Sequence, residues 1–558
     1  MRLLLTTLQR GAKLFAAGGV LAAAACDRGE AGRGGTLIIA TGQDPQNLFP
    51  PTTDRTQARM VTELLFDKLA DLGPALNTLG DAGFQPRLAQ RWEWSRDSLA
   101  VTFHLDPRAR WQDGRRVSAA DVRFALAVYT DTLVGSRSGA DLRPRIDSIS
   151  VADSLTCTAW FRQRTPENFY NLVVTLIPLP EHLLGRTRRD SLAMSPFARS
   201  PVGNGPFRFV RWDPQQRVEI TASDSFYRGR AKLDRVIWTI SPAMTSLVHQ
   251  IFAGEADFLE DLPADAVAEA ARNPDLRLVR RDNFNYGFLL FNLHDNERDG
   301  PHPLFAEREL RRALARALDR ATMVRSVFDS LGAVPRGPFV RAQWAADSTM
   351  AQLAFDRAAA ARTLDSLGWR AGADGVRWRN GRPLRFTLSL STGSKNRQRF
   401  APLIQEQLRL AGVRVDLEVL DDNAFIARRR SRRFDAILNG LGTSPSPSGI
   451  RQCWTSSGAK ENGFNDGRYE NAVFDAHVDS ALAAGDVGVA KAHFRAAYQV
   501  ILDDAPAIFL YEPVPVAAMR RRLQTGALRG DAWWAGIPTW SMATGGRVAR
   551  DSSSTRSP

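Results

Sequence analysis

Cysteine, lysine and long apolar runs are scarce in this sequence, and each scarcity narrows the class of protein. Two of the three cysteines, Cys157 and Cys453, lie almost 300 positions apart, and we expect both to be unpaired. Lysine occurs at only six positions, so the net charge of +14 comes mainly from arginines spread along the chain. No nucleic-acid recognition motif accompanies that charge, and no nucleic-acid partner is expected. Beyond residue 25 no apolar run approaches the ~20 residues that span a bilayer, which argues against an integral membrane protein.

Motifs of catalysis and cofactor binding are also missing. The sequence has no Gly-x-Ser-x-Gly elbow, no His-Glu-x-x-His pair and no phosphate-loop lysine. Its seven histidines are scattered without ligand spacing, so neither a metal nor another cofactor is expected. Ser457 and Lys460 fit the Ser-x-x-Lys spacing of penicillin-recognising enzymes, but the Lys-Thr-Gly motif that accompanies it there is absent. We therefore expect a protein that is not an enzyme.

The N-terminal 25 residues have the pattern of a secretion signal. Residues 1–13 carry three basic residues and no acid, and residues 14–25 form an apolar run too short to cross a membrane comfortably. The run ends in LAAAAC, where small residues precede Cys26 as in a bacterial lipoprotein signal, with the Cys26 thiol carrying the lipid. Ordinary cleavage after Ala25 is the alternative. Either way, we expect the mature chain to be exported, with a short tether at 26–34.

Strands and helices alternate along the rest of the chain. Apolar or alternating runs predict strands, and stretches of helical spacing predict helices between them. The predicted strands include 36–40, 208–212, 217–223, 235–240, 286–293, 385–391, 413–420 and 507–519, and the predicted helices include 306–330, 399–411 and 474–502. Ser118 is placed to cap a helix, and so is the pair Asp421 and Asp422, for which an acid/base pair is the alternative. This alternation is typical of α/β architecture.

The stretch SPVGNGPFRFVRW, residues 200–212, joins a rigid turn to a strand. Pro201 and Pro206 bracket Gly203 and Gly205, and the run that follows alternates as a strand. A phosphate-binding loop would need the glycines to open a helix, so we reject that interpretation. We expect a stiff joint in which the glycines take positive φ values, with a domain boundary near residue 200.

Eight sequence blocks, in order, resemble those of one family. They are PRLAQRWEWSRDSLAVTFHLDPRARWQDGRRVSAADV, IPLPEHLL, SPVGNGPFRFVRW, FYRGRAKLDRVIW, LVHQIFAGEADF, ERELRRALARALDR, FDRAAAARTLDSLGW and IQEQLRLAGVRVDLEVL. With these blocks and the lipoprotein-like start, the chain is similar to the large extracytoplasmic solute-binding proteins of ABC importers. That family includes oligopeptide-, dipeptide- and nickel-binding proteins. The resemblance covers nearly all of the mature chain.

The resemblance implies an α/β fold with two lobes of the periplasmic-binding-protein type (type II, large class). A two-stranded hinge, here 286–293 and 507–514, would join the lobes, and an extra domain would be inserted in lobe one. The implied division is a lipoprotein signal peptide at 1–25, a tether at 26–34, lobe one at 35–79, 200–288 and 512–548, the inserted domain at 80–199, lobe two at 289–511, and a disordered tail at 549–558.

Candidate ligand-binding residues come from the same resemblance. In peptide-binding members, the loop after the strand equivalent to 434–441 carries an aspartate that pairs with the peptide's amino terminus. Here Ser444 or a neighbour takes that position, and no acid occurs between Asp435 and Glu461. A buried ammonium without a carboxylate is costly, which argues against standard capture of a peptide amine. The candidates for the cleft are Gln43, Asp44, Asn439, Thr443, Ser444, Trp454 and Tyr511. The alternative for both aromatic residues is core packing, for Ser444 a plain turn, and for Asp44 a role in shaping its loop.

The function that the resemblance implies is the binding component of an ABC importer. Such a protein captures a peptide-like solute between its lobes, closes around it and delivers it to permease subunits in the inner membrane. The implied protein is a monomer in the periplasm or cell envelope, tethered to the membrane by a lipid at Cys26. Three alternatives stay open: a binder of an oligosaccharide or metal chelate, a sensory receptor on the same fold, and a secreted hydrolase.

Overall fold

The computed structural model describes residues 34–543, apart from 54, 296, 298, 461 and 462, together with 548 and 551. The predicted signal at 1–25, Cys26 and nearly all of the predicted tail at 549–558 lie outside the described residues. Within the described part of the chain, no helix is both long enough and apolar enough to pass through a membrane.

A seven-stranded sheet forms the framework of the first half of the molecule, which we call lobe one. Its strand order is β12-β24-β11-β1-β10-β9-β8. The strands are β1 (Thr36–Thr41), β8 (Phe207–Asp213), β9 (Arg217–Ala222), β10 (Arg235–Ile240), β11 (Phe258–Leu259), β12 (Leu276–Arg280) and β24 (Val516–Arg520). β1 pairs in parallel with β10 and β11, while β8, β9 and β10 form an antiparallel meander. The predicted hairpin after residue 207 is therefore confirmed.

Lobe one also contains a four-stranded antiparallel sheet in the order β4-β5-β7-β6. Its strands are β4 (Ala89–Trp94), β5 (Ala100–Leu105), β6 (Ile146–Asp153) and β7 (Thr156–Phe161). The helices of lobe one are α1 (Thr56–Leu65), α2 (Ala119–Thr130), α3 (Arg137–Leu142), α4 (Asn168–Thr175), α5 (Glu181–Leu184), α6 (Met244–Ala253) and α7 (Ala264–Arg272). Ser118 and Asp121 form a reciprocal capping box at the start of α2, as the sequence predicts.

A six-stranded sheet in the order β16-β23-β13-β22-β20-β21 is the framework of the second half, lobe two. Its strands are β13 (Asn285–Phe291), β16 (Gly332–Ala333), β20 (Arg385–Ser391), β21 (Arg414–Leu420), β22 (Ala436–Gly442) and β23 (Ala507–Pro513). β13 is buried at every position after the first, because it lies inside the sheet between β22 and β23. The parallel pairing of β20 and β21, which the helix at Lys395–Arg409 connects, confirms the predicted β-α-β unit.

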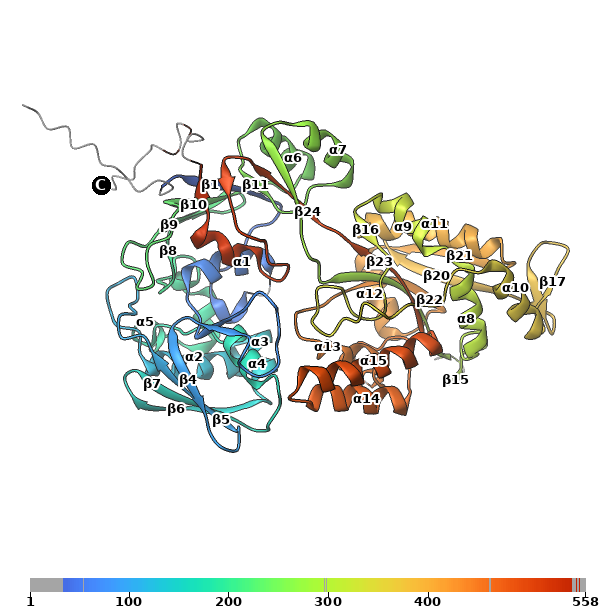
Figure 1. Ribbon diagram of the computed structural model, residues 1–558, viewed down its shortest axis with the longest axis horizontal. Coiled ribbons are helices and arrows are strands. Elements are labelled where there is room, and N and C mark those ends of the chain that lie inside the picture. Colours follow the sequence, from blue (N-terminus) through green and yellow to red (C-terminus); the bar gives the residue numbers. More distant parts are fainter. Residues whose placement is uncertain are drawn as a thin grey trace, which may run out of the picture.

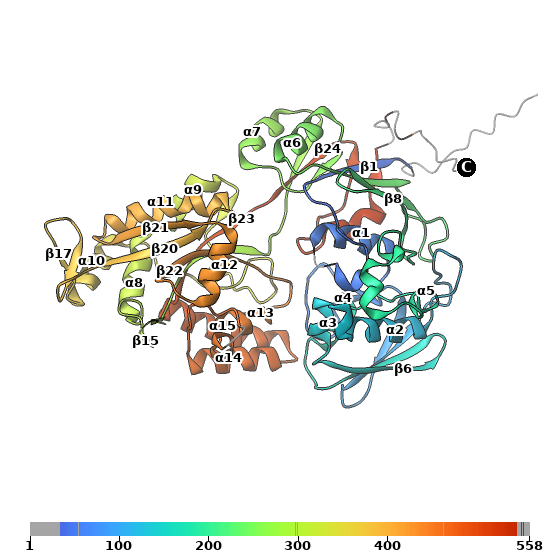
Figure 2. The same cartoon turned by 180° about the vertical axis from the view of Figure 1, so that it is seen from behind.

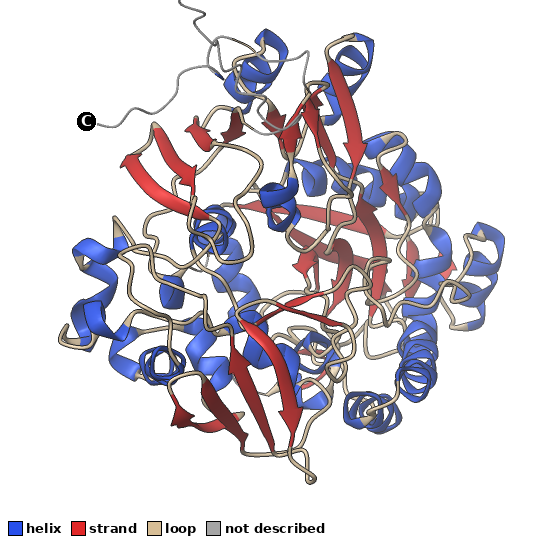
Figure 3. Cartoon of the chain, turned by 60° about the vertical axis from the view of Figure 1, so that its left-hand side comes forward, coloured by secondary structure: helices blue, strands red, loops and turns tan. Residues whose placement is uncertain are grey.

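Helices pack around the strands of lobe two. Figure 3, coloured by secondary structure, shows the helices and strands of the whole chain. The helices of lobe two are α8 (Arg308–Ala317), α9 (Arg320–Phe328), α10 (Arg357–Ser366), α11 (Lys395–Arg409), α12 (Asp422–Ser431), α13 (Gly449–Trp454), α14 (Ala472–Ala483) and α15 (Val487–Asp504). The prediction of a single helix over 306–330 is wrong, because the first helix ends before Leu318. The Asp319 side chain then caps a second helix by accepting a hydrogen bond from the Thr322 amide. The helix predicted over 474–502 is likewise two helices.

The chain crosses between the lobes twice, as Figures 1 and 2 show. The first crossing, residues 281–284, joins β12 to β13, and the second, residues 514–515, joins β23 to β24. The predicted hinge strands lie inside the lobe-two sheet, so the crossings are the short segments beside them. Because β13 begins at Asn285, we propose moving the first lobe boundary from 288 to about 284; the other predicted boundaries stay proposals. Cys157 in β7 and Cys453 in α13 are both free, as predicted.

The joint at 200–206 is stiff because of close packing. Neither Gly203 nor Gly205 has a positive φ, contrary to the sequence-based expectation. Instead, a Cβ on Gly203 would lie 1.9 Å from the Leu65 carbonyl oxygen, and one on Gly205 would lie 2.6 Å from the Leu65 carbonyl carbon. The glycines therefore let residues 203–205 pass directly against the end of α1.

Candidate ligand-binding cleft

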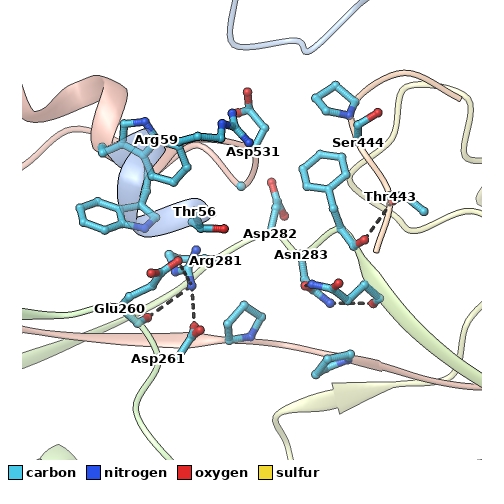
Figure 4. A pocket seen from close by; sticks show the side chains of 18 of the residues that line it. Thr56, Arg59, Glu260, Asp261, Arg281, Asp282, Asn283, Thr443, Ser444 and Asp531 are labelled. Carbon is cyan, nitrogen blue, oxygen red and sulfur yellow. Dashed lines mark hydrogen bonds and ion pairs between the residues drawn. The ribbon is translucent and has the colours of Figure 1, made fainter. Parts of the chain in front are cut away.

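A cavity of about 1100 Å³ lies between the lobes and is lined by both. Figure 4 shows part of its wall. Lobe one contributes α1, the segment after β11 and the segment at 530–534, while lobe two contributes the start of α11 and the loop after β22. Both crossings also line the cavity, through residues 281–284 and 513–516. A ligand in this position would contact both lobes and the segments that connect them.

A partly buried ion cluster lies where α1 meets the cavity. Glu63 accepts hydrogen bonds from Trp534 Nε1 at 2.9 Å and from Arg59, and Lys68 Nζ lies 3.1 Å from it. Burial opposes ionisation, but the two cations and the indole donor outweigh it and lower the pKa of Glu63 to about 2. Glu63 therefore stays ionised at neutral pH and fixes Arg59 and Trp534 in the cavity wall.

A second ion cluster lies at the first crossing. Arg281, 8% exposed, places Nη2 2.5 Å from Asp261 and 3.5 Å from Glu260. Burial, reinforced by the neighbouring charge of Asp261, raises the pKa of Glu260 to about 7 despite the opposing charge of Arg281. This cluster ties the crossing to the segment that follows β11.

The loop after β22 reaches across the cavity to lobe one. Ser446 Oγ donates a 2.7 Å hydrogen bond to Glu167, which precedes α4, and Thr78 Oγ1 donates a 2.5 Å bond to the same carboxylate. Gln343 Nε2 supports the loop from lobe two by donating to the Ser444 carbonyl at 2.8 Å. Burial raises the pKa of Glu167 although both hydroxyls favour its ionised form. The structure therefore has a buried polar contact between the lobes beside the cavity.

A smaller cavity of about 280 Å³ opens behind this loop. It shares Thr443 and Ser444 with the large cavity, and its other walls include Tyr286 and Trp454. Trp454 Nε1 donates to Tyr286 Oη at 3.2 Å, which fixes the two rings. The smaller cavity, lined by lobe-two residues alone, forms a mainly apolar annex beside the charged wall of the large one. Among the described residues, no group of three or more His, Cys, Asp or Glu side chains could hold a metal ion.

The sequence matches a known family over more than half its length. The family model described as bacterial extracellular solute-binding proteins, family 5 (middle region), matches residues 83–462. The chain belongs to this family. Its two lobes have the type II fold of periplasmic binding proteins, which confirms the predicted fold class. The cavity between the lobes is therefore the candidate solute site of a family 5 solute-binding protein.

Relatives of this solute-binding protein match nearly the whole chain. Oligopeptide-binding protein AppA of Bacillus subtilis (strain 168) is 26% identical over 504 residues, 89% of each chain. A probable D,D-dipeptide-binding periplasmic protein, DdpA of Escherichia coli (strain K12), is 24% identical over 88% of this chain and 90% of its own. Among solved structures, B. subtilis AppA in complex with a nonapeptide covers 92% of this chain and all of its own, with 25% identity and a TM-score of 0.72. NikZ from Campylobacter jejuni in complex with Ni(L-His) shares the fold, with 22% identity and a TM-score of 0.73.

Three of the seven candidate residues line these cavities. Thr443 and Ser444 line both, and Trp454 lines the smaller one. Thr443 is held in place, since its amide and hydroxyl both donate to the Phe284 carbonyl, at 2.6 and 3.0 Å. Trp454 is only 2% exposed, so it also packs in the core, which was the alternative interpretation for this residue. Whether these residues contact a ligand stays a prediction.

The other four candidates line neither cavity. Gln43 is exposed, and Asp44 accepts hydrogen bonds from Trp212 Nε1 and the Gln215 amide, so it shapes its loop against the β8–β9 hairpin. Asn439 is buried and accepts a 3.0 Å bond from Arg397. Tyr511 stacks on Phe400 at 4.6 Å in the core of lobe two, above Gly287. The side chains of Asp44, Asn439 and Tyr511 therefore contact other parts of the protein.

Sequence reasoning missed the charged wall of the large cavity. The missed residues are Arg59, Glu63, Arg137, Asp141, Glu260, Asp261, Asp265, Arg281, Asp282, Lys395, Arg399 and Asp531. One usable signal existed: acids follow two short strands directly, in FLEDLPAD after β11 and in RRDN after β12. Polar side chains at strand ends often meet at one edge of a sheet. The contributions of α1 and of 530–534 had no such signal, because only the tertiary fold brings them to the cleft.

Proposed function

We propose that this chain is the substrate-binding component of an ABC importer, that it captures a peptide-like solute in the interlobe cavity, and that it delivers the solute to a membrane permease. The observation that carries the proposal is the cavity of about 1100 Å³ with walls from both lobes and both crossings. A solute in contact with both lobes binds the closed form better and so shifts the population toward it. Moving that balance from 1:99 to 99:1 takes about 5.5 kcal/mol of differential binding.

The chemistry of the walls favours a peptide-like solute. The cavity combines carboxylates, guanidinium groups and indoles, and the annex behind Ser444 adds aromatic walls. Such a surface suits a ligand with charged groups, amides and apolar side chains. The relatives named for oligopeptide and D,D-dipeptide binding support the same class of solute. An oligosaccharide or a metal chelate on the same fold is the competing ligand.

The protein acts by binding, without catalysis. The Ser457 hydroxyl, one half of the Ser-x-x-Lys pattern, forms a 2.8 Å hydrogen bond with Thr455 Oγ1. Among the contacts of the described residues, none joins Ser457 to the Lys460 side chain, so nothing there supports a hydrolase. We further propose that the protein works as a monomer in the periplasm, anchored through a lipid at Cys26.

Titration of the purified protein with three solute classes tests this proposal. Trp533 and Trp534 line the cavity, so a bound solute is expected to change tryptophan emission and raise the thermal unfolding midpoint. The probes are a mixture of synthetic tri- to pentapeptides, a mixture of oligosaccharides, and Ni(L-His). We expect both signals to respond to the peptides. A response to the oligosaccharides or to Ni(L-His) alone would overturn the peptide assignment.

A further inference from the structure

The loop after β22 supplies no negative charge to the cleft. Its side-chain hydroxyls are already engaged: Thr443 bonds to the Phe284 carbonyl, Ser444 to the Ser446 carbonyl, and Ser446 to Glu167. The carboxylate of Glu167 is buried in the contact between the lobes and is absent from the lining of the cavity. A cationic group on a ligand must therefore find its counter-charge elsewhere, because burying it unpaired is costly.

Carboxylates line the opposite wall, and most of them are neutralised by the protein. Glu63 is paired with Arg59 and Lys68, Glu260 and Asp261 with Arg281, and Asp531 with Arg529. The three remaining carboxylates of the lining, Asp141, Asp265 and Asp282, are exposed and form no ion pair or side-chain hydrogen bond with the described residues. All three belong to lobe one or to the first crossing.

Asp282 is the member of this trio that lies in the first crossing, between the two lobes. Figure 4 shows its side chain projecting into the cavity, between Arg59 and Asp531 on one side and Thr443 and Ser444 on the other. The adjacent loop fixes its backbone closely, since a Cβ on Gly530 would lie 2.7 Å from the Asp282 Cβ. Because this crossing connects the lobes, a ligand that contacts Asp282 lies at their junction.

Cationic side chains without an acidic partner are concentrated on lobe two. Five Arg and Lys side chains line the cavity in all, and two of them, Arg59 and Arg281, are ion-paired. Lys395 and Arg399 form no ion pair with the described residues; Arg399 donates only to the Ser326 carbonyl, at 3.1 Å. Four positions apart at the start of α11, they share one face of that helix. The helix N-terminus adds partial positive charge there. Arg137 in lobe one is the single exception to this division.

We propose that the cleft takes a ligand with one cationic and one anionic group, that Asp282 receives the cationic group, and that Lys395 and Arg399 receive the anionic group from lobe two. This inference rests on the proposed function and adds the orientation of the peptide-like solute in the cavity. The ammonium end lies at the first crossing and the carboxylate end at α11. Because opposite ends of the ligand attract opposite walls, such a ligand favours closure of the lobes, and added salt weakens its binding.

The experiment compares free and end-blocked peptides on matched variants. A library of tri- to pentapeptides without Lys or Arg is prepared in three forms: with both ends free, N-acetylated, and C-terminally amidated. Binding is measured by calorimetry for the wild type, Asp282→Asn, the double variant Lys395→Gln/Arg399→Gln, and Asp265→Asn. The last variant is the control, since Asp265 is also an exposed, unpaired carboxylate of the lining. Thermal unfolding confirms that each variant is folded.

We expect Asp282→Asn to weaken binding of the free library about 10- to 100-fold, as for loss of a charged hydrogen bond. Asp282→Asn should leave the affinity for the N-acetylated library unchanged, so that the effects of the substitution and of N-acetylation are not additive. The α11 double variant should behave in the same way toward C-terminal amidation, and Asp265→Asn should change affinity by less than about threefold. Equal effects of Asp282→Asn and Asp265→Asn, or equal binding of free and N-acetylated peptides by the wild type, would overturn the inference and leave the proposed function standing. Failure of the wild type to bind any library would overturn both.

Discussion

The Glu167 carboxylate of lobe one accepts a 2.7 Å hydrogen bond from Ser446 Oγ of lobe two, 279 positions further along the chain. The same carboxylate accepts a bond from Thr78, whose hydroxyl in turn accepts one from Trp344 Nε1 of lobe two at 3.0 Å. The contact is buried, with Glu167 only 6% exposed. It joins the two lobes in the arrangement that the structure shows, which we take as the closed form, and so contributes to the free energy of that form.

Removing this carboxylate is expected to favour the open form. Glu167→Ala leaves the Ser446 and Thr78 hydroxyls without their buried acceptor, at a cost of about 1–3 kcal/mol to the closed state. Because the solute binds the closed state, we expect its affinity to fall about 5- to 150-fold and the radius of gyration of the ligand-free protein to rise in small-angle scattering. Glu269→Ala, an exposed position in α7, is the matched control. Unchanged affinity and scattering would contradict a role in closure.

Glu512 makes stability depend on pH near the second crossing. Burial raises its pKa to about 7, with Arg341 at 3.8 Å only partly compensating, and its Oε1 has no hydrogen-bond partner. The folded protein thus holds this proton more tightly than the unfolded chain does, whose glutamate pKa is about 4.3. The contribution of Glu512 to stability is present below about pH 4 and is lost as pH rises toward 7.

The variant Glu512→Gln removes that dependence. Relative to the wild type, it is expected to gain stability progressively between pH 4 and pH 8, by at most about 4 kcal/mol. Urea midpoints measured across this range test the prediction, with Glu269→Gln as the control for an exposed glutamate. If the difference in urea midpoint between the variant and the wild type stays constant with pH, Glu512 does not titrate as described.

Close packing at Gly203 gives a stability prediction. A methyl group there would overlap the Leu65 carbonyl oxygen, so Gly203→Ala is expected to destabilise the protein by about 1–3 kcal/mol or more. Gly449, the first residue of α13, has open space around its Cβ position, and Gly449→Ala should be neutral or stabilising by up to about 1 kcal/mol. Urea unfolding of both variants makes the comparison. Equal stability of the two would contradict the explanation of the joint.

Anchoring through Cys26 predicts a change in cell fractionation. Wild-type protein should sediment with membranes, whereas Cys26→Ala should leave them, because the thiol that carries the lipid is gone. Immunoblots of membrane and periplasmic fractions measure this. If the wild type itself is released with periplasmic proteins, cleavage after Ala25 without lipidation is the better account.

Local sequence chemistry predicted what depends on neighbouring residues. The caps at Ser118 and Asp421, the β8–β9 hairpin and the β20–α11–β21 unit all follow from short-range patterns. The break at Leu318 was missed although Asp319 is a good cap residue, because the apolar spacing continues through it. A positive φ was expected at Gly203, whereas the structure needs the missing side chain for close approach of the backbone.

The candidate site was predicted less completely, for a physical reason. The family resemblance located the loop with Thr443 and Ser444, which lines the cavity. It also selected Tyr511 and Asn439, whose side chains face the core of lobe two and Arg397, because a backbone position does not determine where a side chain points. The charged wall comes from segments more than 200 residues apart, such as Glu63 and Trp534, and no local pattern connects them.

Native mass spectrometry of the protein, purified without unfolding from its host cells, tests the central claim most directly, since tight binders often retain their solute. The account predicts that the protein carries a mixture of short peptides in the interlobe cavity. Recovery of one oligosaccharide or one metal chelate in their place would contradict it.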